Sequence, residues 1–312
     1  MSSVGSFRIL ITGANGQVGW ELRRSLSSFG EITAVDREEL DLSQESLVRD
    51  FIRDLRPQLI VNAAAYTAVD RAETEVDLCH FLNAEVPRIL AEEAKALDAP
   101  FITYSTDYVF DGESAVPYTE ESTPNPLSIY GRSKLNGDLA VRRVGGAHLI
   151  FRTSWVYGAR GNNFLLTMLR LGREKPNLRV VDDQVGSPTW SRDISEATAQ
   201  VVASIRARAN NSNLSTAVLP VSGIYNLVAS GCTSWFGFAK AIFEEAGLPV
   251  SIVPISTAEY PTPARRPKSS RLSTQKLSET FGICLPDWRV SLAEVLKSLT
   301  ASSETVPSRP QI

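Results

Sequence analysis

A glycine-rich turn near the N-terminus constrains the fold of this chain more than any other feature. Residues 7–12 (F-R-I-L-I-T) are suited to a strand, and they run directly into G-A-N-G-Q-V-G at 13–19. A helical pattern at 20–28 follows, and a second strand-like segment at 31–35 ends at Asp36. A strand, a glycine turn, a helix and a strand in this order predict a βαβ unit that binds a dinucleotide.

The three glycines of this turn each suit a different need of a dinucleotide site. Gly13, Gly16 and Gly19 permit a tight turn, close approach of a pyrophosphate to backbone N–H groups, and close packing of the helix on the strand. The first glycine interval is one residue longer than in G-x-G-x-x-G. Asp36 is placed to accept hydrogen bonds from an adenosine ribose, whereas Arg37 could neutralise a 2′-phosphate. The sequence therefore predicts NADPH or NADH as the cofactor and leaves the choice between them open.

Strands and helices continue to alternate through the first half of the chain. Strand-like segments lie at 58–61, 101–105 and 149–153, and the longest helical pattern between them covers 78–97. This alternation predicts an α/β fold with a Rossmann-type, doubly wound parallel sheet.

The second half predicts a smaller lobe of mixed α/β structure. We expect residues 1–155 to form the NAD(P)-binding domain, with a return segment at about 190–228. Residues 156–189 and 229–300 are expected to form a second domain that binds the substrate, a sugar nucleotide according to the family resemblance described below. The Ser/Pro-rich stretch at 301–312 is expected to be a disordered tail.

Small residues follow the third predicted strand, at the edge where a cofactor of such a sheet binds. Ala63, Ala64 and Ala65 would let a flat ligand lie against the backbone, but they would equally suit the packing of a crossover helix. Asp41 could face an adenine or cap the turn that follows it. The predicted cofactor contacts are Gly13, Asn15, Gly16, Gln17, Val18, Gly19, Asp36, Arg37, Asp41, Leu42, Ala63, Ala64 and Ala65, together with Tyr130 and Lys134.

A tyrosine and a lysine four residues apart follow a proline-rich loop. On a helix, Tyr130 and Lys134 would emerge on one face. An ammonium beside a phenol lowers the phenol pKa from about 10 and suits it to donate a proton. Thr106, at the end of a predicted strand, adds a hydroxyl for the same substrate oxygen. Because a Tyr-x-x-x-Lys spacing also arises by chance, it indicates a catalytic pair only in combination with the predicted dinucleotide site of the glycine turn.

Composition excludes several other classes of function. The net charge is −3 with a pI near 5.6, and no segment is polybasic, which argues against nucleic-acid or acidic-membrane partners. The chain lacks a signal-peptide pattern and a long apolar run, so we expect a cytoplasmic protein. Three isolated cysteines and two distant histidines favour neither disulfides nor a metal centre.

A basic, proline-rich stretch near residue 265 has two interpretations. Arg265, Arg266, Lys268 and Arg271 could bind phosphates, but spacing alone favours a solvated loop.

Six motifs, in one order along the chain, carry a resemblance to a known family. They are G-A-N-G-Q-V-G-W-E-L at 13–22, N-A-A-A-Y-T-A-V-D-R-A-E at 62–73, S-T-D-Y-V-F-D-G at 105–112, Y-G-R-S-K at 130–134, R-T-S-W-V-Y-G at 152–158 and D-Q-V-G-S-P-T at 183–189. Together they resemble the dTDP-4-dehydrorhamnose reductases, which are extended short-chain dehydrogenase/reductases. The similarity runs from about Arg8 to Leu299 and excludes the tail.

The resemblance implies NAD(P)H-dependent reduction of the C4 ketone of a dTDP-4-dehydro-6-deoxy-L-sugar to dTDP-L-rhamnose. It makes Tyr130 the acid, Lys134 the residue that lowers its pKa and holds the nicotinamide ribose, and Thr106 the group that polarises the carbonyl. Arg266 and Arg271 become candidates for the diphosphate. The positions implied to contact the sugar are Val69, Thr106, Asp107, Tyr108, Phe110, Tyr130 and Trp155.

The resemblance also bears on metal and assembly. Some family members are described as dimers bridged by Mg²⁺ through acidic residues; Glu21 matches one of these, but no matching acid lies near Ser191. We therefore expect no metal, a small-molecule substrate, and a monomer or a homodimer.

Three alternatives stay open at this point. Nucleotide-sugar 4,6-dehydratases need an Asp-Glu pair after the threonine, whereas Asp107 and Tyr108 follow Thr106 here. A 4-epimerase is compatible with the glycine turn, although the 105–112 motif argues moderately against it. A non-catalytic NADP-binding regulatory subunit, similar to the beta subunit of methionine adenosyltransferase, could retain the same three side chains.

Overall fold

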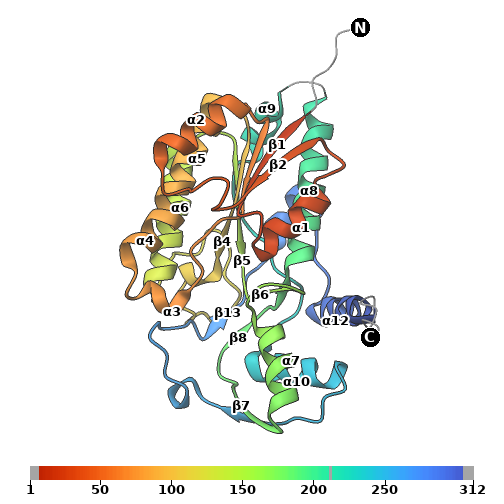
Figure 1. Cartoon of the computed structure of the whole chain (residues 1–312). Helices are drawn as coiled ribbons and strands as arrows, with labels where there is room; N and C mark the ends of the chain where they lie inside the picture. The colour runs from red at the N-terminus through yellow and green to blue at the C-terminus, as the bar shows by residue number, and fades with distance from the viewer. Residues whose placement is uncertain (1–6, 211–212, 305–312) are drawn as a thin grey trace.

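A wholly parallel six-stranded sheet forms the centre of the molecule (Figure 1). The structure is a computed structural model and describes residues 7–210 and 213–304. The spatial order of the strands is β10-β5-β4-β3-β1-β2. Their bounds are β1 Arg8–Thr12, β2 Glu31–Val35, β3 Leu59–Asn62, β4 Phe101–Thr106, β5 His148–Thr153 and β10 Gly223–Asn226. The predicted α/β class with a doubly wound parallel sheet is confirmed.

Helices cover both faces of the sheet. Figure 1 shows one group on one side, α2 (Glu45–Leu55), α5 (Val86–Ala96) and α6 (Ile129–Val144), and another on the opposite side, α1 (Gln17–Ser25) and α8 (Ser191–Ala209). Side chains of β1 alternate between the two layers, because successive residues of a strand point to opposite faces. Ile9 and Ile11 pack with Leu22 of α1 and Ile194 of α8, while Leu10 packs with Ile52 of α2. Burial on both faces explains the continuous apolar runs of these strands.

The helix predicted at 78–97 is interrupted. It consists of α4 (Val76–His80), a π-helical turn η1 (Phe81–Glu85) and α5. Pro87 explains the break, because a proline has no N–H to donate to the carbonyl four residues before it, that of Asn83. The turn buries Asn83, whose amide contacts the backbone of Tyr66 and the hydroxyl of Ser133. It therefore joins the loop after β3 to α6.

Some predicted segment boundaries differ from the structure. Helix α1 begins at Gln17 and not at residue 20, because Gly16 already serves as its N-cap. Helix α9 (Leu214–Val218) was not predicted; at its start the Asn213 side chain accepts a hydrogen bond from the Ser215 N–H. Helix α12 (Trp288–Glu304) continues past residue 301, where we expected disorder; the rest of the predicted tail, 305–312, lies outside the described residues.

The smaller lobe has its own core. Its helices and strands are α7 (Phe164–Glu174), β7 (Asn177–Val181), β8 (Val185–Gly186), β11 (Thr233–Ser234), α10 (Trp235–Glu245), β12 (Ser251–Ile255), β13 (Ser269–Ser270) and α12. Tyr157, Phe238 and Trp288 are buried together there. The short strands β6 (Val156–Tyr157) and β9 (Thr189–Trp190) pair with each other where the chain enters and leaves this lobe. We propose the domain division predicted from the sequence, with α8 and β10 as the returning segment.

Candidate active site

The candidate site begins where the strand order of the sheet reverses. The chain passes from β1 to β2 on one side and then crosses back to β3 on the other side of β1. In open α/β sheets, ligands bind at the carboxyl ends of the strands at such a point. The glycine turn follows β1 and the alanines follow β3, so both predicted motifs meet there. A cleft of about 510 Å³ opens at this edge and is lined by Asn15, Gly16, Gln17, Val18, Ala63 and Ala65, among others.

The geometry of the glycines fits a cofactor pyrophosphate. Gly13 has φ +71°, and a Cβ there would lie 2.6 Å from the backbone nitrogen of Ala64. A Cβ on Gly19 would lie 2.0 Å from the carbonyl oxygen of Gly13, so helix α1 approaches the turn as closely as the sequence predicts. A Cβ on Gly16 would meet only that carbonyl, at 3.2 Å, and would otherwise occupy open space in the cleft. These residues leave room at a helix N-terminus, where an anionic group is favoured.

A second cavity of about 260 Å³ adjoins the turn and suits an adenosine. Asp36 is held at its rim, accepting hydrogen bonds from the N–H groups of Asn15 at 3.0 Å and Arg37 at 2.7 Å. Asp41 lines the same cavity and also caps the next turn, because it accepts the Ser43 N–H, and these bonds lower its pKa. The lining comprises Gly13, Val35, Asp36, Arg37, Leu40, Asp41, Leu42, Ser43, Ala64, Ala65, Leu78 and Leu82. We did not predict Leu78 and Leu82, which belong to the interrupted helix.

The predicted catalytic residues line the same cleft as the glycine turn. Thr106 ends β4, and Tyr130 and Lys134 lie one helical turn apart on α6. Ser128 caps this helix by accepting the Gly131 N–H, and Glu73 accepts the Ile129 N–H at 2.8 Å. The fold therefore brings the phenol and the ammonium of α6 together with the hydroxyl at the end of β4.

Burial, more than the neighbouring lysine, sets the electrostatics of these groups. We expected Lys134 to lower the pKa of Tyr130, but burial raises that pKa, while the interaction with the Thr106 hydroxyl lowers it in part. The ammonium of Lys134 instead donates to the Tyr104 carbonyl at 2.6 Å, and burial lowers the pKa of Lys134 to about 8 against the opposing effect of Asp138. A phenol with a raised pKa is protonated at neutral pH but gives up its proton less readily, because a general acid is most effective when its pKa lies near the working pH.

Four residues implied to contact a sugar also line the cleft: Val69, Asp107, Tyr108 and Trp155. Asp107 bonds to the hydroxyls of Thr106 and Ser270, and burial raises its pKa to about 6. The ring of Tyr108 meets that of Tyr130 edge-on, with centroids 5.5 Å apart.

One aromatic wall of the cleft was not predicted. The ring of Trp155 stacks on that of Trp235, with centroids 3.6 Å apart and an interplanar angle of 6°. Trp235 also lines the cleft. Because Trp235 comes from α10 of the smaller lobe, no short-range sequence signal marks it.

Other predicted residues lie elsewhere. Phe110 is fully buried and stacks on Tyr118 at 4.2 Å, so it lies in a core next to the site and does not line the cleft. Arg271 donates to the Ala115 carbonyl at 2.7 Å and ties two loops together. Arg265 and Lys268 are exposed.

Arg266 lines a third cavity, of about 400 Å³, in the smaller lobe. Trp235 belongs both to this cavity and to the cleft. The remaining lining is largely apolar: Phe164, Thr167, Met168, Leu171, Leu178, Arg179, Val180, Val181, Gln184 and Tyr260.

Glu21, which matches an acidic residue that binds Mg²⁺ in some family members, is paired with two arginine side chains here. Its carboxylate lies 3.2 Å from Arg192 Nε and 3.6 Å from Arg24 Nε. Across 7–210 and 213–304, the structure has no group of three His, Cys, Asp or Glu residues placed to hold a metal ion. In the same ranges, no helix combines the length and the apolar character needed to cross a membrane.

Comparison with known proteins points to one group of enzymes. The family described as "RmlD substrate binding domain" matches residues 7–301. A curated dTDP-4-dehydrorhamnose reductase of Burkholderia thailandensis is 46% identical over 301 residues, which cover 94% of this chain and 99% of that protein. A solved dTDP-4-dehydrorhamnose reductase of Clostridium acetobutylicum is 39% identical with a TM-score of 0.85, covering 94% of this chain and 99% of that chain. The Bacillus anthracis enzyme of that name, solved in complex with NADP, has the same TM-score at 36% identity, covering 93% and 99%.

Proposed function

Because the chain belongs to the family of the RmlD substrate binding domain, together with dTDP-4-dehydrorhamnose reductases, we propose that it reduces the C4 ketone of dTDP-4-dehydro-L-rhamnose to dTDP-L-rhamnose. The observation that carries this proposal is the cleft in which Thr106, Tyr130 and Lys134 share one space with the glycine turn. Relatives named as reductases across nearly the whole chain support an enzyme over the non-catalytic subunit.

When bound, the reduced nicotinamide cofactor supplies the hydride. Tyr130 gives its phenolic proton to the carbonyl oxygen as negative charge develops there. The Thr106 hydroxyl, which donates to Asp107 in the structure, would turn to donate to the same oxygen and orient the carbonyl toward the phenol. Lys134 contributes a positive charge in a buried setting, where electrostatic interactions are stronger than in water. Asp107, whose carboxylate accepts a hydrogen bond from the Ser270 hydroxyl, accepts hydrogen bonds from hydroxyl groups of the sugar.

The substrate would extend from the cleft into the smaller lobe. Val69, Asp107, Tyr108 and Trp155 would surround the sugar, and the cavity beyond Trp235 would receive the nucleotide. Arg266 lines that cavity and is the cation we assign to the diphosphate, in preference to Arg271. The two spaces, of about 510 and 400 Å³, fall within the range typical of ligand pockets.

The cofactor is NADPH or NADH, held by the glycine turn and the adenosine cavity. The solved Bacillus anthracis relative, in complex with NADP, supports a nicotinamide dinucleotide in this fold. In this chain Asp36 favours a free ribose, whereas Arg37 lines the same cavity and can pair with a 2′-phosphate.

One experiment tests the activity and the cofactor together. The loss of absorbance of NADH and of NADPH is followed in parallel, with dTDP-4-dehydro-6-deoxy-L-mannose generated in situ. NMR then identifies the product sugar. Oxidation coupled to the appearance of dTDP-L-rhamnose is expected, and cofactor binding without oxidation would overturn the proposal.

A further inference from the structure

The short helix α3 (Val69–Ala72) links the two sides of the candidate site. Val69 lines the cleft. The next residue, Asp70, points its carboxylate to the loop before β13. One oxygen accepts the Ala264 N–H at 3.2 Å and the other accepts Arg266 Nη2 at 2.8 Å. These contacts join motifs that lie 196 residues apart in the sequence.

The guanidinium of Arg266 lies at the junction between the cleft and the cavity of the smaller lobe. Its side chain is 23% exposed and lines that cavity, while Asp70 follows directly on the cleft residue Val69. Burial raises the pKa of Tyr108, whose ring meets that of Tyr130, and the positive charge of Arg266 opposes this shift. The other arginine of the cavity, Arg179, is 61% exposed and pairs with Glu259 at 2.6 Å. Arg266 is therefore the better placed cation for an anion that spans both spaces.

The opposite end of α3 is fixed as well. Glu73, directly after the helix, accepts the Ile129 N–H at the start of α6, the helix that carries Tyr130 and Lys134. One short segment thus contacts both the catalytic helix and the loop that carries Arg266. A displacement of that loop changes the position of the guanidinium relative to Tyr130.

We propose that Asp70 is a positioning residue that holds the Arg266 guanidinium ready for the diphosphate of the nucleotide-sugar substrate, an inference that rests on the proposed function. A carboxylate near a diphosphate is unfavourable in itself, so its contribution must come through the cation that it orients. A guanidinium has five N–H donors, and one bond to Asp70 leaves others to meet phosphate oxygens in a fixed geometry. Holding the side chain before binding reduces the rotamer entropy lost on binding.

The substitution Asp70→Asn distinguishes positioning from simple repulsion. We expect Kd for dTDP, measured by calorimetry on the full chain with NADPH bound, to rise about 10-fold, as when a hydrogen bond to a charged group is lost. Kd for thymidine, which has no phosphate, is expected to stay within about twofold because only the phosphate contact is weakened. In turnover, KM should rise and kcat should change little. Unchanged or tighter dTDP binding would overturn the proposal, and so would an equal loss for thymidine.

Matched variants separate this role from effects on folding. Arg71, adjacent to Asp70, is 70% exposed and pairs only with Glu75 among the ion pairs of the described residues, so Arg71→Ala should leave dTDP binding unchanged. If Asp70 acts through Arg266, adding Asp70→Asn to Arg266→Lys should weaken dTDP binding no further than Arg266→Lys alone. An additive loss contradicts the proposal. Equal melting temperatures for wild type and Asp70→Asn are the folding control.

The experiments can refute the proposed reductase activity and the proposed role of Asp70 independently of each other. If the wild-type protein binds dTDP but does not oxidise NADPH or NADH with the ketosugar, the reductase proposal fails while the comparison of dTDP with thymidine still decides the role of Asp70. If the wild-type protein does not bind dTDP, the inference about Asp70 fails.

Discussion

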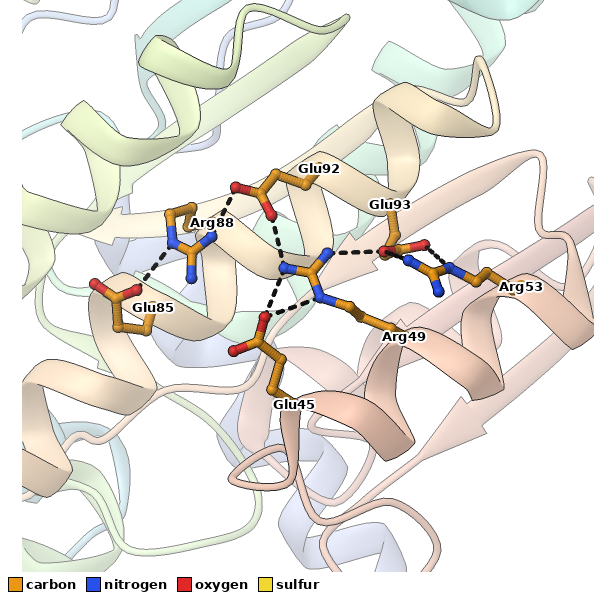
Figure 2. Close-up of polar contacts among 7 residues, drawn as sticks. All are labelled: Glu45, Arg49, Arg53, Glu85, Arg88, Glu92 and Glu93. Atoms are coloured by element: carbon orange, nitrogen blue, oxygen red, sulfur yellow. Dashed lines mark hydrogen bonds and ion pairs between the residues drawn. The ribbon is translucent and has the colours of Figure 1, made fainter.

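Replacement of Glu93 by glutamine should destabilise the protein more than the same change at a neighbouring glutamate. Figure 2 shows Glu93 of α5 between two arginines of α2, within a network that continues to Glu45, Arg88 and Glu92. The Glu93 side chain is only 3% exposed. It accepts hydrogen bonds from Arg49 at 2.8 Å and from Arg53 at 2.9 and 2.8 Å.

The magnitude follows from these contacts. A hydrogen bond to a charged group contributes about 1.5–3 kcal/mol, but the bonds from Arg53, which is 58% exposed, are weakened by solvent. The glutamine amide keeps one acceptor and turns an NH₂ toward a guanidinium. We therefore expect Glu93→Gln to lower the free energy of unfolding by about 2–4 kcal/mol, which corresponds to a fall in Tm of roughly 3–6 °C for a chain of this size.

Calorimetry at neutral pH checks this value, with Glu92→Gln as the matched control. Glu92 accepts hydrogen bonds from Arg49 and Arg88 but is 36% exposed, so its loss should cost about 1 kcal/mol or less. Burial would raise the pKa of Glu93, but hydrogen bonds from Arg53 and Arg49 hold it below its usual value. The stabilisation is therefore present above about pH 4.5 and is lost as pH falls through the folded-state pKa, so the difference between wild type and Glu93→Gln should narrow in acid. Equal stability of the two glutamine variants at neutral pH would refute this reasoning.

Four further predictions concern the site. Tyr130→Phe removes the acid and should lower kcat about 10²–10⁴-fold while the Kd of the cofactor, measured by fluorescence titration, changes little; near-normal turnover would contradict its role. Since the pKa of Lys134 is lowered to about 8, the charged ammonium is lost as pH rises through that value, so kcat/KM should decline above pH 8. A kcat/KM of the wild type that stays constant up to pH 9.5 would exclude this titration of Lys134. The substitution Lys134→Ala should lower both the affinity for the cofactor and the rate of turnover. Asp36→Ala should shift the ratio of kcat/KM values for NADPH and NADH toward NADPH by about 10-fold. An unchanged ratio means that a group other than Asp36 discriminates between the two cofactors at the adenosine ribose.

Much of the cofactor site could be predicted because its determinants are local. The glycine turn, Asp36 and the three alanines each follow a strand directly, and parallel strands bring their carboxyl ends to one edge. The Tyr130–Lys134 spacing likewise depends only on the pitch of one helix.

Electrostatics and the aromatic wall could not be predicted in the same way. The pKa of Tyr130 depends on how deeply the phenol is buried, and burial is a property of all the surrounding elements. Phe110 belongs to the motif at 105–112, which also contains residues that line the cleft, yet the backbone geometry after β4 directs its ring onto Tyr118. Trp235 reaches Trp155 only because the smaller lobe folds against the sheet.

The sequence by itself determined the class of fold and the local placement of the glycine turn and of the Tyr130–Lys134 pair, because each is encoded by residues within one or two adjacent elements. Tertiary structure alone decided that Asp70 meets Arg266, that Trp235 joins the cleft, and that the pKa of Tyr130 is raised. Such contacts join residues far apart in the chain. Their geometry depends on how whole layers pack, which local propensity and spacing do not specify.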